Sequence, residues 1–240
     1  MLCAAALALV LALLVIERRT PEPLLPLTVF RNRDLALGNV VMLLGGAAMV
    51  ALFFALSVFM QEVLGYDALA TGLTQLPLAG ALVIVAGVVP VLNGKRGGRA
   101  VLAASLVVLV GGLVWLAFAP SDAVFLLHLL GPTLLIGVGL GGAFVAITQL
   151  AVDGVQGGEA GLAGGLINTS QQIGGAVGLA VLGSIAGIRT SALDLAGASP
   201  ADALTGGFAW LFLGAAGLSF LEAAGLSFLG AVVVAVWRRA

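Results

Sequence analysis

Residues 161–179 read GLAGGLINTSQQIGGAVGL, an uncharged polar segment flanked by glycines inside a long apolar run. The polar residues run unbroken from Asn168 to Gln172. In lipid no hydrophobic force draws helices together, so transmembrane helices associate through small residues that pack closely and through polar side chains that hydrogen-bond across the gap. The stretch therefore predicts a membrane helix packed tightly against a neighbour.

The composition of the whole chain also indicates an integral membrane protein. Of its 240 residues, 61% are apolar and 9% are charged, whereas a soluble domain is about half apolar and a quarter charged. One cysteine, Cys3, and one histidine, His128, cannot form a disulfide framework or a metal-ligand cluster, so no metal or other cofactor is expected. A net charge of −1 does not suggest a nucleic-acid partner; the expected partner is the lipid bilayer.

Long apolar segments predict an all-α fold. A helix needs about 20 apolar residues to cross a membrane, and polar or Gly/Pro-rich segments separate the candidates. The candidate spans are 2–16, 35–61, 69–92, 100–118, 123–150, 161–187 and 207–236. The predicted organisation is a truncated transmembrane helix (1–16), a cytoplasmic linker (17–34) and a six-helix domain (35–237).

The first candidate span is too short to cross comfortably, since residues 2–16 give about 22 Å of helix against a hydrocarbon core of about 30 Å. A signal peptide would carry its positive charge before the apolar run, but Arg18 and Arg19 follow it. The expectation is that Met1 lies inside a helix whose beginning is missing.

The basic residues predict which side of the membrane each connection faces. Arg189 stands alone on one side, and the other nine fall in alternate connections: Arg18, Arg19, Arg31, Arg33, Lys95, Arg96, Arg99, Arg238 and Arg239. Cytoplasmic loops carry an excess of Lys and Arg. The chain is therefore predicted to be a multi-pass protein of the cell membrane with its C-terminus in the cytoplasm.

Three passages follow one another in an order found in a known family. They are PLLPLTVFRNRDLALGNVV (23–41), NGKRGGRAVL (93–102) and GEAGLAGGLINTSQQIGGAVGLAVLGSI (158–185). They resemble the linker and following helix, the basic loop motif and the penultimate helix of fourteen-helix drug/proton antiporters of the EmrB/QacA type. These antiporters are a branch of the major facilitator superfamily. The resemblance implies that this chain is the C-terminal half, with six helices in a bundle of 3+3 repeats.

The resemblance assigns Lys95, Arg96, Gly97 and Arg99 to the cytoplasmic loop motif. The acidic residue that the motif usually carries is replaced near Gly94. Without that carboxylate, Arg99 is left to pair with a helix C-terminus or with the other half of the transporter.

Amides and glycines of the quoted stretch share one helical face. The amides are Asn168, Gln171 and Gln172, and the glycines predicted to pack are Gly161, Gly164, Gly175 and Gly178. One interpretation is a close seam between helices; another is an amide lining of the translocation pathway. The two are compatible, because the seam between transporter halves borders the cavity.

Other polar residues in the spans also need partners, because an unpaired amide in hydrocarbon costs several kcal/mol. Gln149 lies near the cytoplasmic end of its span and is expected at the interface, whereas Gln75 fits either a helix-pairing bond or a cavity lining. His128 is expected to be an interfacial histidine rather than a proton carrier.

Glu222 is a possible intramembrane acid, and such residues are functional by default. It begins the second copy of a tandem repeat, GAAGLSFL (214–221) and EAAGLSFL (222–229). The repeat lengthens the last span by about 12 Å. Glu222 is therefore either a proton-coupling group or a by-product of the duplication, carried towards water by tilt or extension of the helix.

No enzyme chemistry emerges from these residues, since the sequence has no paired carboxylates within a span, no credible Ser/His/Asp set and no phosphate-binding loop. The resemblance implies export of drug-like or amphipathic molecules in exchange for protons, by alternating access against an N-terminal half. The alternative is a non-transporting membrane scaffold or a homo-oligomeric channel packed through glycine-rich faces.

Overall fold

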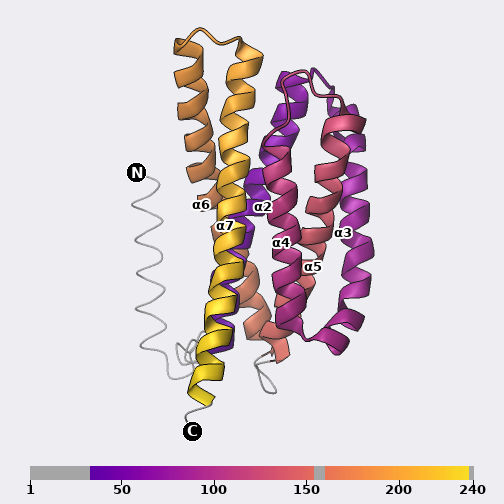
Figure 1. The fold of residues 1–240 in the computed structure, drawn as a ribbon, viewed down its shortest axis with the longest axis vertical. Coiled ribbons are helices and arrows are strands. Elements are labelled where there is room, and N and C mark those ends of the chain that lie inside the picture. The colour runs from indigo at the N-terminus through magenta and orange to yellow at the C-terminus, as the bar shows by residue number, and fades with distance from the viewer. Residues whose placement is uncertain (1–32, 154–159, 238–240) are drawn as a thin grey trace.

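The computed structural model describes residues 33–153 and 160–237, and these residues form a bundle of long helices (Figure 1). No strand occurs among them. The elements are α2 (Arg33–Val58), the π-helical turn η2 (Phe59–Val63), α3 (Ala68–Arg96), α4 (Gly98–Leu116), the π-helical turn η3 (Phe125–Leu129), α5 (Leu130–Asp153), α6 (Ala160–Leu195) and α7 (Pro200–Trp237). The predicted span 2–16 and the linker up to residue 32 lie outside the described residues.

Six of the described helical segments are long and apolar enough to cross a membrane: Gly38–Val63, Ala68–Arg96, Gly98–Leu116, Phe125–Gln149, Gly164–Leu195 and Pro200–Gly225. The all-α prediction and its six spans after residue 34 are thus confirmed. The predicted connection between the last two spans, RTSALDLAGASPAD (189–202), is too long, because α6 runs to Leu195 and α7 begins at Pro200.

Capping residues explain how the connection between α6 and α7 becomes so short. Gly197 has a φ of +86°, the left-handed conformation that ends many helices at glycine. Ser199 Oγ then accepts a hydrogen bond from the Asp202 backbone N–H (3.2 Å), and Pro200 occupies the first helical position. A serine cap followed by proline starts α7 directly after the turn.

The packing of the helices follows a two-fold exchange. Helix α2 packs on α6 and α7, while α5 packs on α3 and α4; α6 also packs on α7, and α3 on α4. Exchanging α2 with α5, α3 with α6 and α4 with α7 converts each of these pairs into another observed pair. The bundle is therefore built from two three-helix units, α2–α4 and α5–α7, as the predicted bundle of 3+3 repeats requires.

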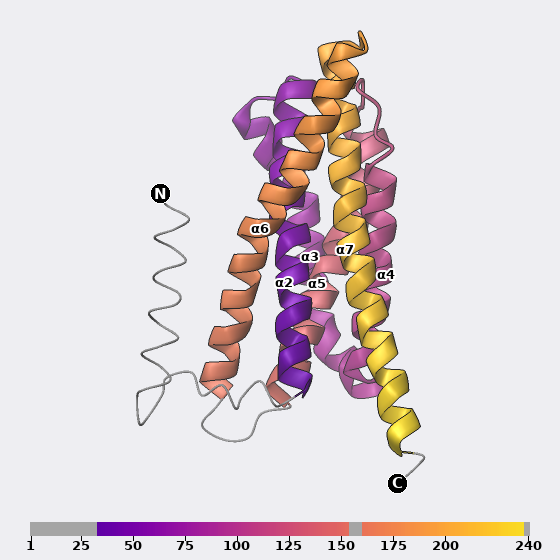
Figure 2. The same ribbon diagram turned by 90° about the vertical axis from the view of Figure 1, so that its left-hand side faces the viewer.

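Successive connections lie at opposite ends of the bundle. The α3–α4 turn lies at the same end as the C-terminal end of α7, and the α6–α7 turn lies at the other end (Figure 1). After a turn of 90°, α6 is seen beside α2 and converging with α7 towards the α6–α7 turn (Figure 2). Lys95, Arg96 and Arg99 flank the α3–α4 turn and therefore share one end of the bundle with the end of α7.

Candidate functional site

The backbones of α2 and α6 touch through glycines. A Cβ atom added at Gly174 would overlap the carbonyl oxygen of Leu43, and one added at Gly178 would overlap Ala47. From the other side, a Cβ atom at Gly46 would overlap the carbonyl oxygen of Gln171. A side chain at any of these positions would push the two helices apart, so the glycines are what allows the close approach.

Two of the four glycines predicted to pack contact α2 in the described structure. Gly175 and Gly178 do pack on α2, with a Cβ atom at Gly175 placed 2.6 Å from Val50 Cγ2. Gly161 and Gly164, by contrast, are exposed, and a Cβ atom there would meet no described atom within 4 Å. The parallel contacts of Gly174 with Leu43 and of Gly178 with Ala47 place Gly164 level with Arg33, where α2 begins, and place Gly161 before that beginning.

Glycines on two faces of α5 hold it between α3 and α4. A Cβ atom at Gly137 would overlap the carbonyl oxygen of Leu78 on α3, and one at Gly139 would lie 2.6 Å from the Leu109 backbone nitrogen on α4. Under the two-fold exchange, the α5–α3 contact corresponds to the α2–α6 contact. Both contacts join one three-helix unit to the other, and in both a glycine of one helix lies against a backbone carbonyl oxygen of its partner helix.

A buried polar pair joins α2 to α6 beside the glycines. Asn39 is buried, its side-chain nitrogen donates to the Leu35 carbonyl oxygen (2.8 Å), and its side-chain oxygen accepts from Ser170 Oγ (2.7 Å). Asn39 is not among the polar residues predicted from the sequence. The rule that drew attention to Gln75 and Gln149, an amide inside an apolar span, applies equally to Asn39 and would have found it.

Ser170→Ala is expected to lower stability by about 1 kcal/mol, because it leaves the Asn39 oxygen without its donor. The matched control is Ser184→Ala on the same helix, whose exposed hydroxyl donates to the Ala180 carbonyl of its own helix. Thermal unfolding of the purified chain in detergent measures both. Equal melting temperatures for the two variants would contradict the prediction.

The remaining predicted amides divide into paired and exposed residues. The Gln75 side chain donates to Ser57 Oγ (3.1 Å), which joins α3 to α2. Gln149 accepts a hydrogen bond from the Asn93 side chain, which joins α5 to α3. Asn168 and Gln172 lie on the exposed side of α6 and join no helix pair in the described part of the chain.

The basic loop motif forms one tight turn. Gly97 has a φ of +83° and is the single residue between α3 and α4, which explains a glycine at this position. Lys95 and Arg96 are exposed in the last turn of α3, where positive side chains stabilise the partial negative charge of a helix C-terminus. Arg99 is exposed in the first turn of α4.

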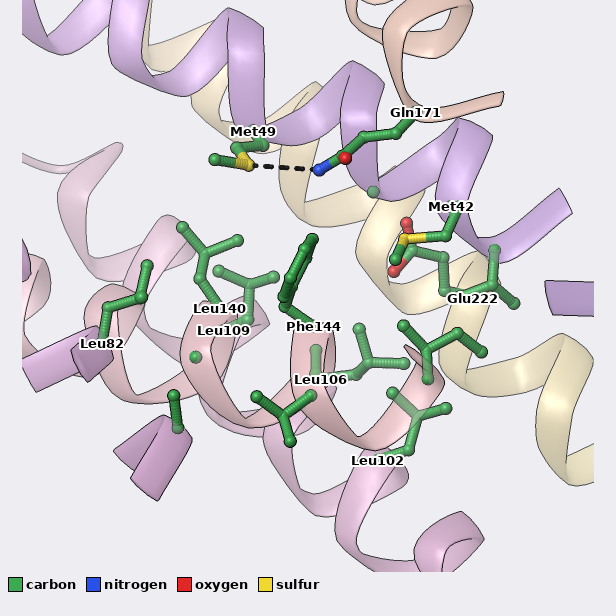
Figure 3. A pocket seen from close by; sticks show the side chains of 17 residues that line it. Met42, Met49, Leu82, Leu102, Leu106, Leu109, Leu140, Phe144, Gln171 and Glu222 are labelled. Carbon is green, nitrogen blue, oxygen red and sulfur yellow. Dashed lines mark hydrogen bonds between the residues drawn. The ribbon is translucent and has the colours of Figure 1, made fainter. Parts of the chain in front are cut away.

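A cavity of about 190 Å³ lies inside the bundle, and residues from all six long helices line it. Most of its lining is aliphatic, with Phe144 of α5 and the thioethers of Met42 and Met49 of α2. Two polar side chains reach it. They are Gln171, which contacts Met49 Sδ at 3.8 Å, and Glu222 (Figure 3).

Glu222 is buried, with 3% of its surface exposed, so the length of α7 does not carry it towards water. Its Oε1 atom has no hydrogen-bond partner among the described residues. Gly45 of α2 makes room for the carboxylate, since a Cβ atom there would lie 3.4 Å from Oε1. The cavity therefore brings together two residues that lie in different predicted spans, Gln171 and Glu222.

The remaining titratable residue of interest, His128, has a local structural role. Its Nδ1 atom accepts a hydrogen bond from the Val124 backbone N–H (3.0 Å) at the start of η3. In the described part of the chain, no group of three or more His, Cys, Asp or Glu side chains could hold a metal ion.

Comparison with known proteins establishes the family. The model of the Major Facilitator Superfamily matches residues 1–179. The chain belongs to the major facilitator superfamily. It is therefore a multi-pass membrane protein of a transporter superfamily, and the 3+3 bundle is the architecture expected of a superfamily member.

Similar superfamily members are named for export or resistance. The cephamycin export protein CmcT of Amycolatopsis lactamdurans is 38% identical over 190 residues, which cover 78% of this chain and 39% of that protein. The multidrug resistance protein Stp of Mycobacterium tuberculosis is 34% identical, covering 71% and 31%. The puromycin resistance protein pur8 of Streptomyces alboniger is 32% identical, covering 82% and 40%. The matched region thus spans less than half of each relative.

Proposed function

We propose that this chain is the C-terminal half of a proton-coupled efflux transporter for drug-like or amphipathic small molecules. The observation that carries the proposal is the cavity, which is apolar apart from Gln171 and Glu222 and is enclosed by a superfamily bundle. Small-molecule sites typically combine apolar walls with a few polar groups in this way. The names of the relatives, which refer to export and resistance, support the same substrate class.

The size of the cavity supports a partner half. A drug-sized ligand typically occupies a pocket of about 300–1,000 Å³, and this cavity has about 190 Å³. Helices α3 and α6 are also the least buried of the six spans. We propose that an N-terminal half, in the same longer chain or as a separate partner, covers these two helices and enlarges the site.

The exposed amides of α6 fit this arrangement. Asn168 and Gln172 face away from α2, on a helix that has little cover within the described structure. In the proposed transporter they line the path between the halves, and alternating access moves one half against the other. The end of the bundle with Lys95, Arg96 and Arg99 then lies on the cytoplasmic side of the cell membrane, together with the C-terminus.

The test is reconstitution of ethidium efflux in vesicles that carry a proton gradient. The 240-residue chain alone is expected to show no gradient-dependent efflux, and a fusion behind the N-terminal half of CmcT is expected to restore it, with full inhibition by a protonophore. Gel filtration before reconstitution verifies that both proteins are folded.

Two results would overturn the proposal: gradient-dependent efflux by the chain alone, or a folded fusion without efflux. Protonophore-insensitive dye leakage through the chain alone would instead support the alternative, a homo-oligomeric channel.

A further inference from the structure

The end of α3 nearest the α3–α4 turn contains residues that weaken a helix. Pro90 lies inside α3 and has no backbone N–H, so it cannot donate the helical hydrogen bond to the Ala86 carbonyl oxygen. Gly87 and Gly94 flank the proline at exposed positions. Sharp bends in helices occur mostly at proline, and glycine adds backbone freedom. Residues 90–96, named the terminal segment of α3 below, can therefore bend as one short piece.

The middle of α3, in contrast, is fixed to α5 by backbone contacts. A Cβ atom at Gly137 would overlap the Leu78 carbonyl oxygen, and one at Gly141 would lie 2.5 Å from the Leu82 carbonyl oxygen. The other proline of α3, Pro77, directly precedes the first of these contacts. Both contacts lie before Pro90, so they hold the middle of the helix and leave its end to other interactions.

A polar pair joins the terminal segment to α5. The side-chain nitrogen of Asn93 donates a hydrogen bond to Oε1 of Gln149. Oδ1 of Asn93 is buried and has no hydrogen-bond partner among the described residues. One hydrogen bond between amides contributes little net free energy, and a buried acceptor left unpaired costs free energy. The closed arrangement is therefore only weakly favoured, because water can satisfy both amides when they separate.

The Asn93–Gln149 pair lies at one end of the cavity. Ile147 lines the cavity from α5, two positions before Gln149. Leu102 lines it from α4, four positions after that helix begins, and Ala86 lines it from α3, four positions before Pro90. Movement of the terminal segment away from α5 would therefore uncover this end of the cavity.

We propose that the terminal segment of α3 is a gate to the cavity, hinged at Pro90 and held shut by the Asn93–Gln149 hydrogen bond. The gate deepens the proposed function, on which it rests, by naming where a substrate enters the C-terminal half. The entrance lies between α3 and α5, at the end that the proposed topology places on the cytoplasmic side. Opening leaves the backbone contacts of Leu78 and Leu82 in place, because these lie before the hinge.

The test measures how fast a buried cysteine in the cavity wall reacts with a water-soluble thiol reagent. Leu102→Cys, at a fully buried position, is introduced into a Cys3→Ser chain, since Cys3 is the one cysteine of the sequence. The reagent is 2-sulfonatoethyl methanethiosulfonate, and mass spectrometry follows its reaction with the purified chain in nanodiscs. Gln149→Leu leaves the Asn93 amide without its acceptor and is expected to accelerate the reaction by about tenfold or more. Asn93→Ala breaks the same bond from α3 and is expected to act in the same way.

Matched variants separate the effects of the hydrogen bond and of the hinge. Gln75→Leu makes the same substitution at the amide that joins α3 to α2, and is expected to leave the Leu102→Cys rate unchanged. Pro90→Ala restores a backbone N–H, and in the Gln149→Leu chain it is expected to lower the raised rate. Pro77→Ala in that chain is expected to have no effect, because the adjacent Leu78 is held against Gly137.

A second reporter detects general loosening of the fold. Leu129→Cys lies at a fully buried position of η3, at the other end of the bundle, and is expected to react as slowly in Gln149→Leu as in the parent. Three results would overturn the gate. They are an unchanged Leu102→Cys rate in folded Gln149→Leu and Asn93→Ala chains, an equal acceleration in Gln75→Leu, and an equal acceleration at Leu129→Cys.

Thiol labelling of the chain alone is independent of efflux, so the two proposals fail separately. Labelling that depends on Gln149, together with a fusion that exports no dye, would refute the transport function and keep the gate as a property of the bundle. Active efflux by the fusion, together with a Leu102→Cys rate that Gln149→Leu leaves unchanged, would refute the gate and keep the transport function.

Discussion

Gly174→Ala is expected to be strongly destabilising, although it adds a single methyl group. The new Cβ atom would overlap the carbonyl oxygen of Leu43 and lie 2.6 Å from its carbonyl carbon. Both atoms belong to the backbone of α2, so no side-chain rotation can relieve the overlap. Overpacking typically costs about 1–3 kcal/mol. We expect a value near the upper end, because α2 as a whole must move away from α6.

The matched control for Gly174→Ala is Gly183→Ala. It makes the same change on the same helix, at a glycine whose added Cβ atom would meet nothing described within 4 Å. Replacing glycine with alanine inside a helix otherwise stabilises it by up to about 1 kcal/mol. The measurement is the temperature at which the heated protein loses its monodisperse gel-filtration peak. Equal losses in both variants, or no loss in Gly174→Ala, would contradict the α2–α6 contact.

Gly139→Ala is expected to have a comparable effect at the contact between α5 and α4. Its Cβ atom would lie 2.6 Å from the backbone nitrogen and 2.7 Å from the Cα atom of Leu109 on α4. Such distances leave no room for a methyl group, so α5 must separate from α4. Because Leu109 also lines the cavity, this separation should change the shape of the ligand site as well as the stability of the fold.

Gly111→Ala on α4 is the control for this second change, because a Cβ atom there would have open space within 4 Å. The same heating assay compares the two variants. The prediction requires a loss of stability in Gly139→Ala and none in Gly111→Ala. A Gly139→Ala protein as stable as the parent would contradict the α4–α5 contact.

The sequence predicted the spans well because length and hydropathy are local properties. It predicted the α6–α7 connection poorly, for an equally local reason. The residues SPAD (199–202) are polar and contain proline, which predicts a break, yet serine before proline is also a helix start. Their role depends on whether the chain turns before or after them, and Gly197 places the turn before them.

The candidate site was predicted by residue type but not by partner. An amide within an apolar span must be satisfied, which identified Gln75 and Gln149 but did not reveal Ser57 and Asn93 as their partners. Asn39 and Ser170 are 131 positions apart, so their contact depends on the pairing of α2 with α6. The placement of Glu222 against Gly45 likewise depends on the rotation of α7, which helical periodicity alone does not determine.

The glycine contacts also determine how the bundle responds to force. Where side chains separate two helices, they can change rotamer and absorb a small displacement, as in shear motions of packed helices. At Gly46, Gly174 and Gly137, backbone lies directly against backbone, so no intervening side chain can absorb a displacement. A displacement of α6 is therefore transmitted directly to α2, and a displacement of α3 is transmitted directly to α5. Each pair of helices is expected to move as one rigid unit. The six-helix bundle is therefore expected to move as a rigid body, with conformational change confined to its periphery.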